Sequence, residues 1–234
     1  MNFLKVSCFL SSVFCLLSCK PIDIKNEQHF SDVVSIVVFD NDIKYIKNSY
    51  STFLAQGLDT IQGETCGFAS YIVNYDEQPA ITPPFEADLI SWKRFDVSSF
   101  QYMSGSILDT YKETMLSISS VLNLNQFMFL TVDQKTPEDY IYNYELLCCK
   151  DSVDKNDIIT MYLKTKLGVQ GIDTVPVNRK SMIAFNIFPF LEDQIKQGND
   201  SLIQFNIKYS SKTDPIGNPV YSSYKSNPVK IKHP

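Results

Sequence analysis

Apolar and polar residues alternate along most of this chain, and that two-residue period constrains the fold more than any other feature. The clearest example is Ile-Gln-Phe-Asn-Ile-Lys-Tyr at residues 203–209. Successive side chains of a strand point to opposite faces, so such a segment has one dry face and one wet face. Residues 127–132 (Phe-Met-Phe-Leu-Thr-Val) are apolar on both faces, which is typical of a central strand. The pattern predicts an all-β protein built of packed antiparallel sheets.

Two segments depart from this period. Residues 107–122 carry apolar side chains at helical spacing, but 116–122 also alternate, so the segment fits either a helix or a strand. Residues 189–197 fit a short helix that ends at Gly198. We therefore expect at most one or two short helices.

Composition excludes several classes of protein. With 234 residues and 44% hydrophobic content, the chain can bury a core, so global disorder is not expected. The net charge is −5, and Lys and Arg are spread along the chain. A phosphate-backbone partner requires clustered cations, so no nucleic-acid partner is predicted.

The first 19 residues predict the location. Lys5 precedes a short apolar run that ends in Leu16-Leu17-Ser18 before Cys19. Residues 1–18 are thus predicted to be a lipoprotein signal peptide, with Cys19 as the lipidation site; an ordinary secretory signal cut after Ser18 is the alternative. Lipidation would anchor the chain in the bacterial envelope, with the outer membrane favoured and its face left open. Residues 19–32 are polar without a clear period and are predicted to form a flexible tether.

Small polar residues suggest a division of the remainder. Ser98-Ser99 and Ser104-Gly105-Ser106 cluster between two strand-rich regions. The predicted domains are residues 33–103 and 104–234.

Three cysteines remain after Cys19. Cys148 and Cys149 are neighbours on a predicted strand, so their side chains point apart and cannot easily bridge. Either all three thiols are unpaired, or Cys66 bridges to Cys148 or Cys149. The spacing of a zinc site is absent from the sequence, and no metal or cofactor is predicted.

Residues suited to catalysis are few. His29 lies in the predicted tether and His233 is the penultimate residue, so a histidine-activated nucleophile is not expected. Glu86, Asp88 and Asp96 could supply paired carboxylates for glycoside hydrolysis, but a solvated strand face is the favoured interpretation of these residues. We expect no enzymatic activity, and keep a carboxylate-based polysaccharide hydrolase as an alternative.

Aromatic side chains give the candidate binding surface. Trp92 is the sole tryptophan, and Tyr140, Tyr142 and Tyr144 share one face of a predicted strand. They either anchor a partner or cover the core with their polar atoms toward water.

The chain resembles the NigD-like lipoproteins of Bacteroidetes. The resemblance rests on the lipoprotein start, on Gly63 followed by Tyr-Ile-Val-Asn-Tyr-Asp at 71–76, and on a late pair of strands at 182–187 and 202–209. It implies an N-terminal OB-like β-barrel followed by a C-terminal β-sandwich. The family's activity is not established, so the resemblance assigns no catalytic residues.

Together these features predict a non-enzymatic, membrane-anchored binding or assembly module. Its partner is expected to be a protein, or less readily a glycan. The association of the resembled family with bacteriocin genes adds an alternative, an immunity-type lipoprotein that neutralises a toxin. The sequence leaves the oligomeric state open.

Overall fold

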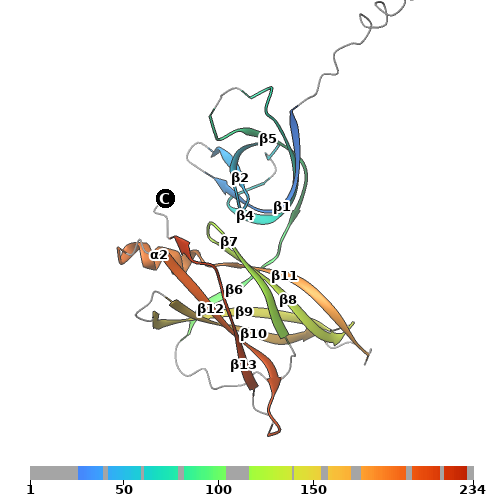
Figure 1. The fold of residues 1–234 in the computed structure, drawn as a ribbon, viewed down its shortest axis with the longest axis vertical. Coiled ribbons are helices and arrows are strands. Elements are labelled where there is room, and N and C mark those ends of the chain that lie inside the picture. The colour runs from blue at the N-terminus through green and yellow to red at the C-terminus, as the bar shows by residue number, and fades with distance from the viewer. Residues whose placement is uncertain are drawn as a thin grey trace, which may run out of the picture.

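The chain folds into two β lobes that lie one above the other (Figure 1). The computed structural model describes residues 26–38, 42–58, 61–78, 82–103, 116–138, 140–153, 158–169, 175–198, 202–216 and 219–230. The predicted signal peptide, Cys19 and the start of the predicted tether lie outside these ranges. The prediction of an all-β fold with two lobes is confirmed.

The first lobe is a closed five-stranded barrel. Its strands are β1 (Glu27–Val38), β2 (Lys44–Lys47), β3 (Thr52–Gln56), β4 (Thr65–Asn74) and β5 (Glu86–Arg94). Their order around the barrel is β1-β2-β3-β5-β4, and only the β3–β5 pair is parallel. A small closed barrel of five strands is the architecture of OB-like folds, as the resemblance implied.

In its described residues, the second lobe is one large, strongly curled sheet with a single helix. It contains β6 (Val97–Met103), β7 (Leu116–Leu124), β8 (Phe127–Pro137), β9 (Ile141–Val153), β10 (Ile158–Val169), β11 (Pro176–Asn186), α2 (Phe188–Lys196), β12 (Leu202–Thr213), β13 (Pro219–Lys225) and β14 (Val229–Lys230). The strand order is β13-β12-β10-β9-β6-β11-β8-β7, and β14 pairs with β12. Because β7 at one end contacts β12 near the other, the sheet nearly closes on itself.

This sheet is mixed, whereas the sequence predicted an antiparallel sandwich. Three strand pairs are parallel, namely β6–β9, β6–β11 and β10–β12. The two layers expected of a sandwich are two parts of one sheet that curls back over itself. Alternation of apolar and polar residues reports which face of a strand is dry. It is the same in parallel and antiparallel pairs, so it carries no information about strand direction.

Two predicted boundaries also shift. Residues 27–32 of the expected tether belong to β1, where they pair with β4 from Glu27↔Asn74 onward. Residues 97–103, expected in the first domain, form β6 in the middle of the larger sheet. Both corrections have the same cause. Short polar stretches suggest a linker in the sequence, but here they lie within hydrogen-bonded strands.

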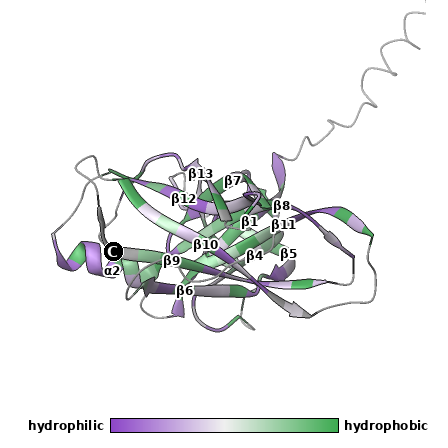
Figure 2. Ribbon diagram, turned by 90° about the horizontal axis from the view of Figure 1, so that it is seen from below, coloured by the Kyte–Doolittle hydropathy of each residue, from purple (hydrophilic) through white to green (hydrophobic). Residues whose placement is uncertain are grey.

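Hydrophobic side chains fill each lobe and also join them. Figure 2 shows hydrophobic segments gathered in the middle of the molecule and hydrophilic ones toward its periphery. A separate apolar cluster joins Cys66 of the barrel to Phe129 and Ala184 of the larger sheet, with Val33 and Phe95 packed against it. The rings of Phe95 and Phe129 meet edge to face, with centroids 6.0 Å apart. This junction cluster gives the two lobes a shared core.

The one described helix agrees with its predicted position. Pro189 lies in its first turn, where a missing backbone N–H costs nothing. Gly198 follows the helix with φ = +72°, a left-handed conformation that suits glycine. The ambiguous segment resolves as strand from Leu116 onward, and residues 104–115 lie outside the described part.

Cys66 forms no disulfide in the structure, so neither of the two predicted bridges from it is present. Cys66 and Cys148 are buried thiols in different apolar clusters, and the side chain of Cys149 lies outside the described residues. Burial raises the pKa of the Cys66 thiol to about 12, although the nearby Arg94 lowers it.

We expect Cys66 to resist alkylation in the folded chain. At pH 8 the shift from 9.0 to about 12 lowers its thiolate fraction about a thousandfold. Since the unfolded thiol ionises first, this group also makes the free energy of unfolding fall as pH rises from about 9 toward 12. Mass spectrometry of the Cys66 peptide after iodoacetamide treatment, with and without denaturant, tests this. Equal labelling in both samples would contradict it.

Candidate functional site

The predicted tryptophan lies on the inner face of the barrel. Trp92 of β5 pairs with the fully buried Ala69 of β4, and its half-buried ring packs against the barrel core. Gly67 lies so close that a Cβ built on it would be 2.8 Å from the indole atom Cη2. Trp92 therefore fills the barrel interior, and its role in binding stays a prediction.

The three predicted tyrosines are half-buried at one end of the larger lobe. Tyr144 points inward, where its hydroxyl donates to Gln134 Oε1 at 2.7 Å. Burial and the neighbouring Tyr142 raise its pKa to about 12, although Arg179 lowers it. Arg179 in turn donates to the carbonyl oxygens of Tyr140 (3.3 Å) and Glu138. These contacts make Tyr144 part of the packing, and a binding role for the three tyrosines also stays a prediction.

The predicted carboxylates do not gather around a pocket that the structure describes. Glu86 and Asp88 lie two residues apart on β5, and Asp96 is exposed beyond the end of that strand. Within the described ranges, no three His, Cys, Asp or Glu side chains approach one another as a metal site would require. The described helix α2 is too short and too polar to cross a membrane.

A groove on the outer face of the larger lobe is the most developed candidate site. Its volume is about 300 Å³, and it is lined by Tyr162, Lys208, Tyr221, Ser222 and Ser223, here called the tyrosine groove. Register places Tyr162, Lys208 and Ser223 in one row across β10, β12 and β13. Tyr221 is two residues from Ser223, so alternation returns it to the same face.

Ring contacts fix the shape of this groove. The rings of Tyr162 and Tyr221 are nearly perpendicular (88°), with centroids 6.3 Å apart. Lys208 Nζ lies over the Tyr162 ring, 5.5 Å from its centroid, which is a cation–π contact. One aromatic face thus holds an ammonium group. Tyr221 remains 45% exposed.

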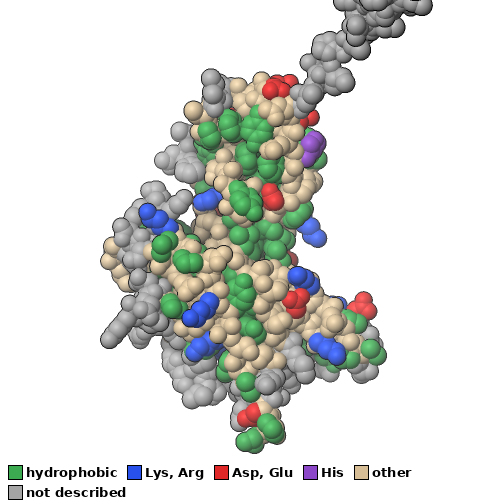
Figure 3. Space-filling view, viewed as in Figure 1, with side chains coloured by type: hydrophobic (Ala, Val, Ile, Leu, Met, Phe, Trp, Pro, Cys, Tyr) green, Lys and Arg blue, Asp and Glu red, His purple; other side chains and the backbone are tan. Residues whose placement is uncertain are grey.

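The surroundings of the groove are partly cationic. Lys225 lies two residues beyond Ser223 and is exposed, whereas Lys164 lies directly opposite Glu145 of β9. Figure 3 shows Lys and Arg side chains among hydrophobic ones over the front of the larger lobe, where Figure 1 places β12 and β13. The groove therefore combines an aromatic ring, hydroxyl groups and a fixed positive charge.

Sequence reasoning missed this site. The segment 203–209 was correctly predicted to have a polar face, but a polar face of one strand does not identify its neighbours. Tyr162 meets Lys208 only because β10 and β12 pair in parallel, which alternation does not report. The one available signal was that Tyr162 and Lys208 both occupy wet positions of clear strands.

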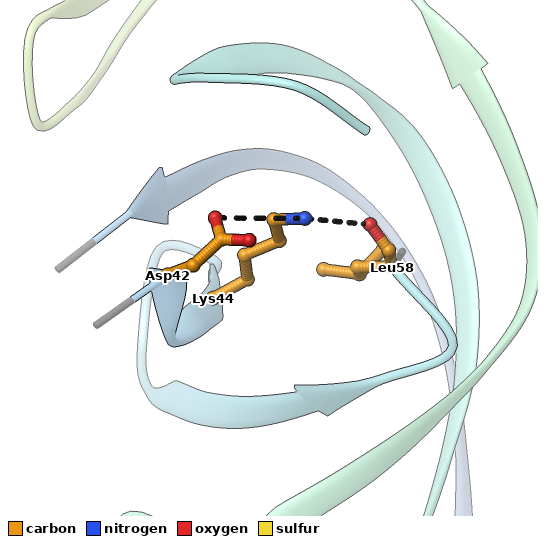
Figure 4. Close-up of polar contacts among 3 residues, drawn as sticks. All are labelled: Asp42, Lys44 and Leu58. Carbon is orange, nitrogen blue, oxygen red and sulfur yellow. Dashed lines mark hydrogen bonds and ion pairs between the residues drawn. The ribbon is translucent and has the colours of Figure 1, made fainter. Parts of the chain in front are cut away.

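A second hollow, of about 280 Å³, opens in the barrel wall. It is lined by residues 42–44, 54–56 and 58, at the point where the β2–β3 register ends with Tyr45↔Leu54. Lys44 Nζ donates to the carbonyl oxygen of Leu58 at 3.1 Å and lies 3.9 Å from Asp42 Oδ1 (Figure 4). The Lys44 side chain is only 10% exposed, so these two contacts hold it across the opening. Lys44 thus links β2 to the segment that follows β3.

The geometry defines a class of two-lobed β protein, an OB-like barrel joined to a curled mixed sheet. A protein of Parabacteroides merdae described as uncharacterised has this fold: TM-score 0.62, 13% identity, covering 87% of this chain and 100% of that one. A proposed lipoprotein of Bacteroides fragilis matches with TM-score 0.57 and 11% identity, over 85% and 97% of the two chains. A NigD-like immunity protein of Bacteroides caccae matches with TM-score 0.52 and 13% identity, over 82% and 91%. No family profile and no curated protein matches the sequence.

These similarities establish the fold. The resemblance to NigD-like proteins expected from the sequence is confirmed at that level. The sequence identity is too low to assign the function or the site residues of these proteins to this chain.

Proposed function

We propose that this chain is a lipid-anchored, non-catalytic binding protein of the bacterial envelope, and that it holds its partner in the tyrosine groove. The observation that carries the proposal is the groove itself, an exposed aromatic side chain beside a positioned ammonium group on a rigid sheet. Binding sites characteristically combine apolar or aromatic walls with a few placed polar groups. The chemistry of that groove determines whether the partner is a protein or a glycan.

The anchor part of the proposal rests on Cys19. A cysteine directly after Leu16-Leu17-Ser18 fits lipid attachment, and the fold is shared with a protein described as a lipoprotein. Each buried methylene contributes ~0.8 kcal/mol, so several acyl chains would hold the protein permanently. We place the anchor in the outer membrane.

Labelled palmitate and site-specific crosslinking test the two parts separately. The parent chain is expected to incorporate palmitate, and Cys19→Ser is expected to lose both the label and membrane association. A photo-crosslinking residue at Ser223 should capture a partner in cells, whereas the same residue at the exposed Ser91 of β5 should not. Equal capture from both positions would argue against the tyrosine groove, and undiminished palmitate labelling of Cys19→Ser would argue against the anchor.

An immunity role is the second candidate, because one neighbour is described as a NigD-like immunity protein. The partner would then be a protein toxin that acts at the envelope. Cells that express the chain should survive a bacteriocin from a neighbouring gene cluster that kills cells without it. Survival equal to that of the unprotected cells would exclude this role for the toxin tested.

A further inference from the structure

We propose that the tyrosine groove recognises an anionic saccharide, with the carboxylate of the sugar on Lys208 and a sugar ring on Tyr221. This inference rests on the proposed binding function and adds the chemical class of the ligand. Three features of the groove carry it, namely the exposed ring of Tyr221, the restrained charge of Lys208 and the hydroxyl group of Ser223.

The first feature is a free aromatic platform. Of the two rings, Tyr162 already carries the Lys208 ammonium over its face. Tyr221 stands at 88° to it and is 45% exposed, so its ring is accessible from solvent. An exposed tyrosine offers a flat apolar surface with a polar edge, and a pyranose ring has the matching apolar face. The two perpendicular rings form a corner in which one sugar residue would be seated.

The second feature is a positive charge that is already in position. Lysine side chains normally lose much rotamer freedom on binding, which lowers affinity. The ring of Tyr162 restrains Lys208 before any ligand arrives, and Lys208 is half-buried. Lys225 adds a second charge on the same face, while Glu145 offsets Lys164. The groove is thus selective for an anion over a neutral ligand.

The third feature is a hydroxyl group beside the ring. Ser223 lies in the same row as Lys208 and is exposed. Its hydroxyl group can both donate and accept, as sugar hydroxyl groups do. A chain of Asp or Glu residues would use the charge of the groove, but it has no flat ring face to place on Tyr221.

Binding of a galacturonate oligosaccharide to the full-length protein in detergent micelles tests the proposal. The methyl-esterified form of the same oligosaccharide removes the charge and keeps the ring, and polyglutamate keeps the charge without the sugar. We expect the free acid to bind at least about tenfold more tightly than either comparator. We also expect that binding to weaken as salt is added, because the charge pairs lie at the surface.

Two groove variants and one control complete the experiment. Tyr221→Ala and Lys208→Met should each weaken binding at least about tenfold, and methionine keeps an unbranched side chain without the charge. Lys93→Met, on the exposed outer face of the barrel, should bind as the parent does. Unfolding midpoints within a few degrees of the parent would show that the variants fold.

The outcomes separate this inference from the proposed function. Equal binding of the acid and its ester, tight binding of polyglutamate, or parent-like binding by both groove variants would each overturn the saccharide assignment. So would failure of the free acid to bind. Crosslinking from Ser223 in cells would still succeed if the groove binds a different partner, and would fail if the groove binds nothing.

Discussion

Gly67→Ala is expected to destabilise the chain by about 3 kcal/mol or more, and to prevent the barrel from closing in its present form. A Cβ at this position would lie 2.3 Å from the carbonyl oxygen of Lys93 and 2.8 Å from Cη2 of Trp92. The first of these atoms is backbone of β5, which is paired with β4 at this point. A rotamer change cannot relieve such a contact, so β4 and β5 would have to separate.

Urea denaturation of Gly67→Ala and Gly168→Ala gives the matched comparison. The Cβ of the second variant would lie 2.8 Å from the side-chain amide of Asn143, which can rotate away, and 3.3 Å from the backbone oxygen of Ile141, where a shift of a few tenths of an ångström is enough. Its free energy of unfolding should stay within about 1 kcal/mol of the parent, because alanine also lowers the entropy of the unfolded chain. Equal stability of the two glycine variants would show that the close approach of β4 and β5 is not required.

Asn48→Ala is the second substitution with a large expected effect, a loss of about 2–4 kcal/mol. Asn48 is buried after β2, and its Oδ1 accepts from the backbone N–H groups of Tyr50 (2.8 Å) and Ser51 (2.7 Å). Its Nδ2 donates to the Tyr71 hydroxyl at 2.9 Å and to Asp32 Oδ2 at 3.2 Å. One amide thus forms the β2–β3 turn and satisfies polar groups at the end of the barrel core. Alanine would remove the hydrogen bonds of the Asn48 side chain to the two backbone N–H groups, the Tyr71 hydroxyl and the Asp32 carboxylate.

Two further variants test this account of Asn48. Asn74→Ala removes a single exposed turn contact, from Asp76 N to Oδ1 at 3.1 Å, and should cost less than about 1 kcal/mol. Asn48→Asp retains the acceptor for the turn but places a carboxylate beside Asp32. Its deficit in unfolding free energy should be larger at pH 7 than at pH 4, because two neighbouring carboxylates repel each other only when both carry charge. A deficit independent of pH would contradict the proximity of the two groups.

Asp32 and Asn48 also affect the pKa of Tyr71. Burial raises the pKa of its phenol, and the Asp32 carboxylate raises it further, while the hydrogen bond from Asn48 lowers it. The phenol therefore stays neutral in the folded barrel at every pH at which the protein is expected to work. It serves as a fixed donor to Asp32 at 3.4 Å.

Local rules predicted the strands and the helix, because each depends on neighbours in sequence. Ile203, Phe205 and Ile207 are buried and the residues between them are not, as alternation requires. The helix at Phe188–Lys196 has Pro189 in its first turn and Gly198 shortly after its end, two residues whose backbone preferences act within one turn. Closure of the first lobe as a barrel came from the resemblance to a family, not from these local rules.

Pairing partners were not predictable in this way, because they depend on long-range packing. After β5 the chain leaves the barrel, and β6 enters the larger sheet between β9 and β11, both of which are far from it in sequence. The tyrosine groove depends on three strands that pair across the same sheet, so it was missed together with their register. The sequence left Trp92 and Tyr144 with either a core or a surface role. In the structure both residues pack against a hydrophobic core.

The position of β6 has a mechanical consequence. A pull applied at Glu27 loads β1 along the ladder that it shares with β4, and passes through the junction cluster and β6 into the centre of the larger sheet. Load that arrives at an interior strand is shared by neighbours on both sides, whereas an edge strand would unzip one bond at a time. A pull at Glu27 would therefore be shared across the larger sheet instead of loading a single edge strand.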